Sequence, residues 1–166
     1  MVISYILIGL FVLIDFITKQ IFSNIYNLNE LQEIIPGILN FGYVQNTGAS
    51  FGMLAGKQFL FFIITIIALL IFGYFFSKSN IKTKKVYTIA LILLISGTLG
   101  NAIDRLLYGY VIDFVQMPFL PIVGSTIFNV ADIFLNFGVA MLFIDIIILD
   151  YYRSKKSKEV GQNEEN

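Results

Sequence analysis

The sequence predicts an all-α membrane protein whose 166 residues form a single domain with four transmembrane helices. Three observations lead to this prediction: the composition, four long apolar stretches and the clustering of the charges. Hydrophobic residues make up 57% of the chain and charged residues 13%, whereas soluble domains average roughly 45–50% and about 25%. A water-surrounded core of this size cannot hold so much Ile, Leu and Phe, so a bilayer is the expected solvent.

Each expected span is an apolar stretch of about 20 residues, long enough to cross the hydrocarbon core as a helix. The first span has polar residues, Asp15 and Lys19, near its outer end. It lacks the basic start and small-residue cleavage site that are typical of a signal peptide. The expected spans are residues 4–22, 59–77, 86–107 and 132–150.

The positive charges indicate the orientation. Four spans place both termini on one side, together with the connection that contains Lys78–Lys85. Eight of the eleven cations lie in this connection or between Arg153 and Lys158, so the positive-inside rule assigns that side to the cytoplasm. We therefore expect a multi-pass cell-membrane protein with a membrane-embedded domain over 1–152 and a polar cytoplasmic tail over 153–166. The formal net charge of zero gives no indication of nucleic-acid binding.

The outer face receives two connections, residues 23–58 and 108–131, and both exceed the usual length of a loop. Pro36-Gly37 has the composition of a turn. Three short segments of these connections have strand-like composition. They are residues 38–45, 110–115 and 125–130.

Two absences from the composition narrow the possible chemistry. The chain has no Cys and no His, which excludes thiol nucleophiles, Ser-His-Asp triads and zinc sites built from these ligands. Acid-base catalysis must then come from Asp, Glu, Lys, Tyr or water.

Ionisable residues at membrane depth are costly, so each is a candidate for function. Asp15 and Lys19 are four positions apart on one helix face. They either form a self-neutralising pair whose lysine extends to the interface, or contact a substrate or headgroup. Asp145 and Asp150 belong near the cytoplasmic end instead.

A polar stripe is also expected on the third span, because Gly97, Asn101, Asp104 and Arg105 recur at three- and four-residue spacing. Gly97 would let another backbone come close. Two interpretations stay open. The stripe is either a packing surface with an internal Asp104–Arg105 tie, or the polar wall of a reaction cavity.

Asp113 and Asp132 form the best candidate pair of acids at the outer edge. Asn129 and Asp132 have the spacing of a helix capping box, whereas Asp113 lies in a segment where an acid has no local cap to make. Two close carboxyls cannot both ionise easily, so they share a proton and can act together as acid and base on an attacking water. Asp15 and Asp104 remain possible members of such a pair.

The chain resembles the lipoprotein signal peptidase family in five ordered motifs between about residues 15 and 132. They are Asp15–Lys19 (DFITK), Asn46–Phe51 (NTGASF), Gly97–Arg105 (GTLGNAIDR), Val111–Phe114 (VIDF) and Phe128–Asp132 (FNVAD). One departure is Ser50, where the family often has a second alanine. Because serine is also small, we expect local tuning rather than loss of activity.

The resemblance implies four transmembrane helices with a small extracytoplasmic β-cradle, built largely from residues 23–57. It implies an aspartic endopeptidase with the catalytic dyad Asp113 and Asp132, no cofactor and no metal. The enzyme would cleave a prolipoprotein just before its diacylglyceryl-modified cysteine, would contact membrane lipids, and would be inhibited by globomycin-type peptides. The residues that line or support its site would be Asp15, Lys19, Asn46, Gly48, Gly97, Asn101, Asp104, Arg105, Asn129 and Ala131.

Two other classes of function stay open. In an ion- or proton-coupled transporter, Asp113, Asp132 and Asp104 would form a relay, although transporters usually bind near the midplane on broken helices. A non-catalytic assembly factor would tolerate loss of either aspartate.

Overall fold

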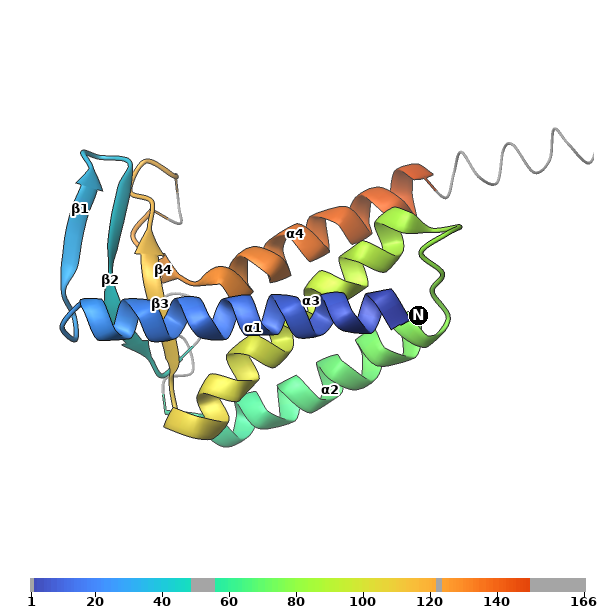
Figure 1. Cartoon of the computed structure of the whole chain (residues 1–166), viewed down its shortest axis with the longest axis horizontal. Coiled ribbons are helices and arrows are strands. Elements are labelled where there is room, and N and C mark those ends of the chain that lie inside the picture. The colour runs from blue at the N-terminus through green and yellow to red at the C-terminus, as the bar shows by residue number, and fades with distance from the viewer. Residues whose placement is uncertain (1, 49–55, 122–123, 150–166) are drawn as a thin grey trace, which may run out of the picture.

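Four long helices run side by side in the computed structural model, which describes residues 2–48, 56–121 and 124–149 (Figure 1). They are α1 (Val2–Ile25), α2 (Gln58–Ser77), α3 (Lys85–Tyr108) and α4 (Val130–Ile144), and a π-helical segment, Asp145–Leu149, continues α4. All four helical stretches in the described part of the chain are long and apolar enough to cross a membrane. In lipid, a helix satisfies its backbone polar groups internally, which is why such apolar sequences adopt it. Each predicted span coincides with one of these helices, with ends that differ by a few residues.

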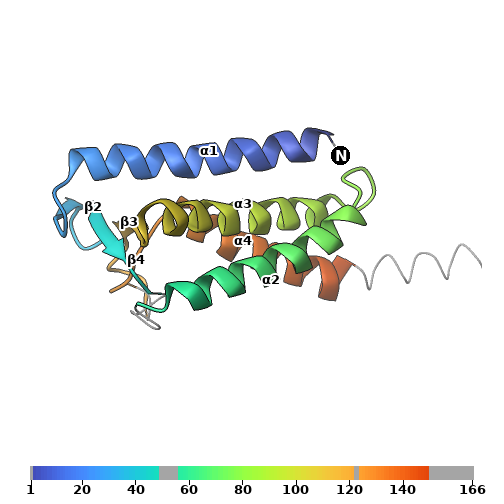
Figure 2. The ribbon, with the colours of Figure 1, turned by 90° about the horizontal axis from the view of Figure 1, so that it is seen from below.

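Helix α3 is the centre of the bundle. It packs against the other three helices, with α1 on one side and α2 on the other (Figure 2). Its buried apolar residues Leu91, Ile92, Leu94 and Ile95 form the core together with Phe76 of α2. Burial therefore concentrates in α3, while the other helices keep much of their apolar surface facing outward.

Close approach of α3 and α4 depends on glycine, as the sequence predicts. A Cβ atom added to Gly97 would lie 2.5 Å from the carbonyl oxygen of Ala131, and one added to Gly138 would lie 3.1 Å from that of Ala90. Backbones at this separation leave no room for a side chain. The Gly97 contact lies in the first turn of α4, next to Asp132.

A four-stranded antiparallel sheet lies at one end of the helices (Figure 1). The first outer connection forms β1 (Leu31–Ile35) and β2 (Leu39–Asn46), and the second forms β3 (Val111–Gln116) and β4 (Ile127–Phe128). The order is β1-β2-β3-β4, and the register pairs Val44 with Asp113. Both outer connections thus contribute a hairpin to the β-cradle.

The strands predicted at 38–45 and 110–115 are confirmed within one residue at each end. The strand predicted at 125–130 is shorter, because Asn129 caps α4 and the helix begins at Val130. The β1 strand was not predicted from the sequence. Pro36-Gly37 forms the turn between β1 and β2, with Gly37 at a φ of +69° that favours glycine.

Aromatic stacking holds the sheet on the bundle. The Phe22 ring of α1 stacks on that of Phe114 at 4.2 Å between centroids and contacts the Phe41 ring of β2 at 5.0 Å. Because Phe114 follows Asp113, this contact fixes the part of β3 that carries a candidate catalytic acid.

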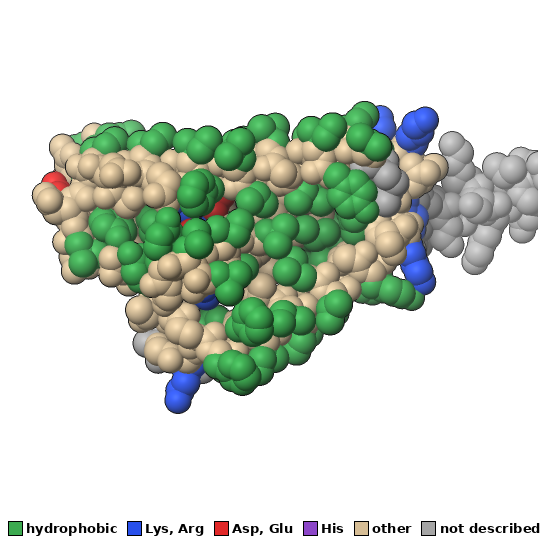
Figure 3. Space-filling model, turned by 60° about the horizontal axis from the view of Figure 1, so that its bottom comes forward, with side chains coloured by type: hydrophobic (Ala, Val, Ile, Leu, Met, Phe, Trp, Pro, Cys, Tyr) green, Lys and Arg blue, Asp and Glu red, His purple; other side chains and the backbone are tan. Residues whose placement is uncertain are grey.

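The helices present an apolar wall, and Lys and Arg side chains gather at the end away from the sheet (Figure 3). That end carries the α2–α3 connection and the start of α3, with Lys78, Lys82, Lys84 and Lys85. The N-terminus lies at the same end (Figure 1). The tail predicted over 153–166 and the motif residues 49–51, including Ser50, lie outside the described residues.

Candidate active site

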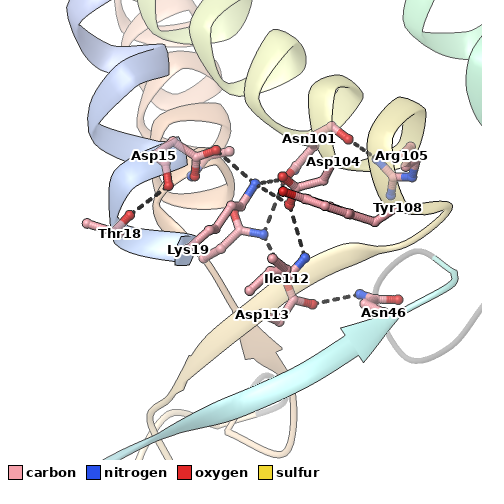
Figure 4. A network of polar contacts seen from close by, with 12 residues as sticks. Asp15, Thr18, Lys19, Asn46, Asn101, Asp104, Arg105, Tyr108, Ile112 and Asp113 are labelled. Atoms are coloured by element: carbon pink, nitrogen blue, oxygen red, sulfur yellow. Dashed lines mark hydrogen bonds and ion pairs between the residues drawn. The ribbon is translucent and has the colours of Figure 1, made fainter. Parts of the chain in front are cut away.

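The candidate site lies where the sheet meets α1, α3 and α4, and the Lys19 ammonium lies among Asp15, Asn101 and Asp104 (Figure 4). Lys19 is fully buried. Its Nζ lies 2.8 Å from Asp15 Oδ2 and 3.0 Å from Asp104 Oδ2, and it donates to Asn101 Oδ1 at 3.0 Å. The Asp15–Lys19 pair is present, and of the two interpretations left open for it, the one in which the lysine extends to the interface is wrong because Lys19 is enclosed by the bundle. Three oxygen atoms replace water around the buried charge, which offsets the cost of burial.

Asp104 forms its ion pair with Lys19 of α1. The interpretation in which Asp104 pairs with Arg105 on the same helix is therefore wrong. Arg105 reaches elsewhere. Its guanidinium donates to the carbonyl oxygens of Gly48 at 3.2 Å and Asn101 at 3.4 Å, and it lies over the Phe61 ring of α2 at 4.4 Å. Arg105 therefore joins α3 to α2 and to the start of the segment that follows β2.

The first turn of α4 presents Asp132 through the predicted capping box. Asn129 is the N-cap, and its Oδ1 accepts the backbone N–H of Asp132 at 3.0 Å. Asp132 Oδ2 accepts the backbone N–H of Asn129 at 3.2 Å. The remaining oxygen, Oδ1, accepts from the Asn101 side-chain amide at 2.8 Å. The capping interpretation is confirmed, and it leaves Asp132 half-buried beside the α3 stripe.

Asp113 projects from β3 into the same region and is only 2% exposed. Its Oδ1 accepts from Asn129 Nδ2 at 2.6 Å, and its Oδ2 accepts from Asn46 Nδ2 at 2.8 Å. Asn129 thus contacts both aspartates, since its Oδ1 caps the turn that carries Asp132. The two acids are neighbours linked through one asparagine.

The pKa of Asp113 is raised from 3.8 to about 7, chiefly by burial and also by the nearby charge of Asp132. The amide donors of Asn46 and Asn129 and the charge of Lys19 oppose this increase, because they favour the ionised form. A carboxyl with a pKa near neutrality can hold a proton beside a second carboxyl. Such a pair can both activate a water and donate a proton.

The structure brings all the predicted site residues into one region. Asp15 Oδ1 accepts the Ala131 backbone N–H at 2.7 Å, and the Gly48 backbone N–H donates to Asn46 Oδ1 at 2.9 Å. Two further residues contact this group and were not predicted from the sequence, Ile112 and Phe61. Ile112 donates its backbone N–H to Asp104, a contact that its side-chain type could not reveal.

The carboxylates of the site are engaged by Lys19, by amides and by backbone N–H groups. Within residues 2–48, 56–121 and 124–149, no three residues of the types His, Cys, Asp and Glu are grouped so that they could hold a metal ion.

These features define a polytopic membrane protein in which Asp113 and Asp132 belong to one hydrogen-bond network at the sheet end of the helices. Comparisons with known proteins identify the family. A model of the family described as signal peptidase (SPase) II matches residues 7–148. The lipoprotein signal peptidase of Latilactobacillus sakei subsp. sakei is 43% identical over 146 residues, which cover 87% of this chain and 93% of that one. The Staphylococcus aureus (strain JH9) lipoprotein signal peptidase is 41% identical over 156 residues, covering 93% of each chain.

Two solved structures described as bacterial membrane enzymes are also similar. One, at 36% identity, has a TM-score of 0.79 and covers 89% of this chain and 94% of its own. The other, at 38% identity, has a TM-score of 0.78 with 93% and 92% covered. The chain belongs to the signal peptidase II family, and it is a bacterial membrane peptidase. This assignment favours the peptidase over the transporter and the assembly factor.

Proposed function

We propose that this chain is an aspartic endopeptidase that removes the signal peptide of prolipoproteins by cleaving just before a diacylglyceryl-modified cysteine. Asp113 and Asp132 act as its catalytic dyad. The observation that carries the proposal is the link between these two carboxyls through Asn129, with burial holding the pKa of Asp113 at about 7. The lipoprotein signal peptidases to which the chain is similar support the choice of substrate.

The dyad shares one proton. The ionised carboxyl takes a proton from a water molecule as the water attacks the scissile carbonyl, and the protonated carboxyl hydrogen-bonds to the oxygen that becomes negative. The tetrahedral intermediate then collapses, the C–N bond breaks, and the proton passes to the leaving amine of the cysteine. The pair titrates as a unit, so neither aspartate has a fixed role as acid or base.

The position of the site suits a substrate held by lipid. Asp132 is in the first turn of α4 and Asp113 is on the sheet next to the helix ends, so the dyad meets the bilayer boundary. Acyl chains buried along the apolar helices stabilise the complex by about 0.8 kcal/mol per CH₂. This term offsets the cost of withdrawing a peptide bond from water. Globomycin-type peptides are expected to inhibit by occupying the same site, and membrane lipids to surround it.

The orientation follows from the charges at the other end. Lys78, Lys82, Lys84 and Lys85 lie away from the sheet, and the positive-inside rule assigns them to the cytoplasm. The termini are then cytoplasmic, and the dyad is at the outer face.

The test replaces each acid with its neutral isostere. We expect Asp113→Asn and Asp132→Asn each to abolish cleavage of a lipidated precursor in detergent micelles, while thermal unfolding shows a folded protein. Asp145→Asn is the matched control, since Asp145 is also buried but lies in the π-helical segment at the far end of α4. It should cleave at the wild-type rate. Substantial turnover by either dyad variant would reject the aspartic mechanism.

A further inference from the structure

Each dyad aspartate follows a residue whose backbone N–H is held by another carboxylate. Ala131, just before Asp132, donates to Asp15 Oδ1 at 2.7 Å. Ile112, just before Asp113, donates to Asp104 Oδ2 at 3.0 Å. These bonds fix the backbone at the two places where the proposed catalytic side chains begin. Asp15 of α1 thus binds the backbone of α4, and Asp104 of α3 binds the backbone of β3.

Lys19 connects these two carboxylates. Its Nζ lies 2.8 Å from Asp15 Oδ2 and 3.0 Å from Asp104 Oδ2, and the side chains involved are at most 1% exposed. One ammonium therefore joins the carboxylate that holds the Asp132 turn to the carboxylate that holds the Asp113 strand (Figure 4). Without it, two buried negative charges would face each other and repel.

Lys19 also sets the direction of an amide. Asn101 Oδ1 accepts from Lys19 Nζ at 3.0 Å, which turns Asn101 Nδ2 toward Asp132 Oδ1 at 2.8 Å. The same Oδ1 accepts from Asn129 Nδ2 at 3.2 Å, and that amide donates to Asp113. A charged donor can only face an oxygen, so the ammonium excludes the flipped amide, which would present an acceptor to the Asp132 carboxylate.

We propose that Lys19 is a positioning residue that fixes the separation and the hydrogen bonding of the two dyad carboxyls through Asp15, Asp104 and Asn101. The inference rests on the proposed aspartic dyad and extends it. Lys19 is buried among Asp15, Asp104 and Asn101, so it acts on the reaction through these groups. Its charge is one of the factors that favour the ionised form of Asp113, so its removal raises the pKa of that carboxyl.

The test uses a charge-matched variant, because Lys19→Met alone leaves two buried carboxylates without their cation and is expected to impair folding. Asp15→Asn/Lys19→Met removes one charge of each sign, and the asparagine keeps an oxygen for the Ala131 N–H. Asp104→Asn/Lys19→Met also removes one charge of each sign, and its asparagine keeps an oxygen for the Ile112 N–H. Lys82→Met is the control, since Lys82 is an exposed lysine at the end away from the sheet.

We expect at least one double variant to unfold within a few degrees of wild type and to lose roughly 100-fold in kcat, the loss that a displacement of about 1 Å produces. The KM of this variant should stay within about threefold of the wild-type value. The high-pH limb of kcat/KM should move to higher pH, a change that a purely structural role would not produce. The Lys82→Met control should match wild type in all of these.

A folded double variant with the wild-type kcat and pH profile would overturn the positioning role. Asp113→Asn, measured in parallel, separates the two proposals. If it retains activity, the dyad itself is wrong. If it is inactive while the double variants cleave normally, the dyad stands and only the role of Lys19 is rejected.

Discussion

The side-chain amide of Asn129 lies 2.6 Å from Asp113 Oδ1, although Asn129 is also the N-cap of α4. One side chain thus uses its oxygen to start the helix that carries Asp132 and its nitrogen to bind the other aspartate. The sequence left open whether Asn129 and Asp132 belong to a cap or to a site. In the structure the capping residue itself contacts Asp113, so the cap belongs to the same hydrogen-bond network as both candidate acids.

The two roles of Asn129 can be separated by substitution. Serine is about as good an N-cap as asparagine but has no amide donor. We expect Asn129→Ser to keep the cap of α4 but to lose roughly 1.5–3 kcal/mol of unfolding free energy, since the buried Asp113 loses its 2.6 Å donor. It should also cleave at least about tenfold more slowly. Asn129→Ala should lose roughly a further 0.5–2 kcal/mol of unfolding free energy, because alanine cannot cap the helix. Wild-type cleavage by Asn129→Ser would show that the amide contact is dispensable.

Much of the fold was predictable because the bilayer constrains it strongly. Spans of about 20 apolar residues and the lysines of the α2–α3 connection gave the helices and their topology. The β1 strand was missed because Leu31–Ile35 has no alternation of buried and exposed residues: all five side chains are exposed. The π-helical end of α4 has no sequence signal, since Asp145–Leu149 reads as a continuation of the helix.

The sequence predicted which residues gather at the candidate site, but not which of them contact one another. Asp15 and Lys19 are a complete ion pair by local spacing, so nothing in the sequence required a third partner. The third and fourth partners, Asp104 and Asn101, are on α3, and Asn101 is 82 positions away. Only the packing of α1 against α3 brings them together, and that packing encloses Lys19 instead of letting it reach the interface.

The pKa of Asp113 makes a prediction about stability. The folded protein binds this proton more tightly than the unfolded chain does, because the pKa is about 7 in one and 3.8 in the other. The stabilisation is therefore fully present below about pH 4 and is lost as the pH rises through about 7, with a total on the order of 4 kcal/mol. We expect Asp113→Asn to remove this decline. Thermal unfolding in detergent across this range measures it, and parallel curves for wild type and variant would contradict it.

Activity should depend on pH with the same sign. The proposed mechanism requires one proton shared by the two carboxyls, so kcat/KM of the wild type is expected to fall as the pH rises through about 7, where Asp113 loses its proton. Bound substrate excludes water from the site, which disfavours the ionised carboxyl. The pH dependence of kcat reports the enzyme–substrate complex, whereas that of kcat/KM reports the free enzyme. The decline of kcat should therefore occur at higher pH than the decline of kcat/KM. A pH-independent kcat/KM across this range would argue against a dyad with a shared proton.

Close packing of α3 on α4 predicts a contrast between two glycines. A Cβ atom at Gly97 would lie 2.5 Å from the Ala131 carbonyl oxygen, whereas one at Gly73 on α2 would meet nothing within 4 Å. We expect Gly97→Ala to cost about 1–3 kcal/mol of stability through overpacking and to lower kcat by displacing the turn that carries Asp132. Gly73→Ala should be neutral or slightly stabilising, since alanine favours the helix. Equal behaviour of the two variants would show that α4 can shift without consequence.

The position of the dyad at the helix ends predicts that cleavage depends on the lipid of the substrate, if the proposed function holds. The diacylglyceryl group would anchor the cysteine at the bilayer boundary, and so deliver the scissile bond to the depth of Asp132 in the first turn of α4. A precursor without the diacylglyceryl group loses roughly 0.8 kcal/mol of binding free energy for each CH₂ that the group would bury. We expect kcat/KM for an unlipidated precursor to fall by at least about 100-fold relative to the same precursor carrying the diacylglyceryl group. A precursor whose cysteine carries a short acyl thioether should give an intermediate value, because it buries fewer methylenes. Equal rates on all three substrates would mean that the peptide alone positions the bond, and the link between the depth of the site and its specificity would be wrong.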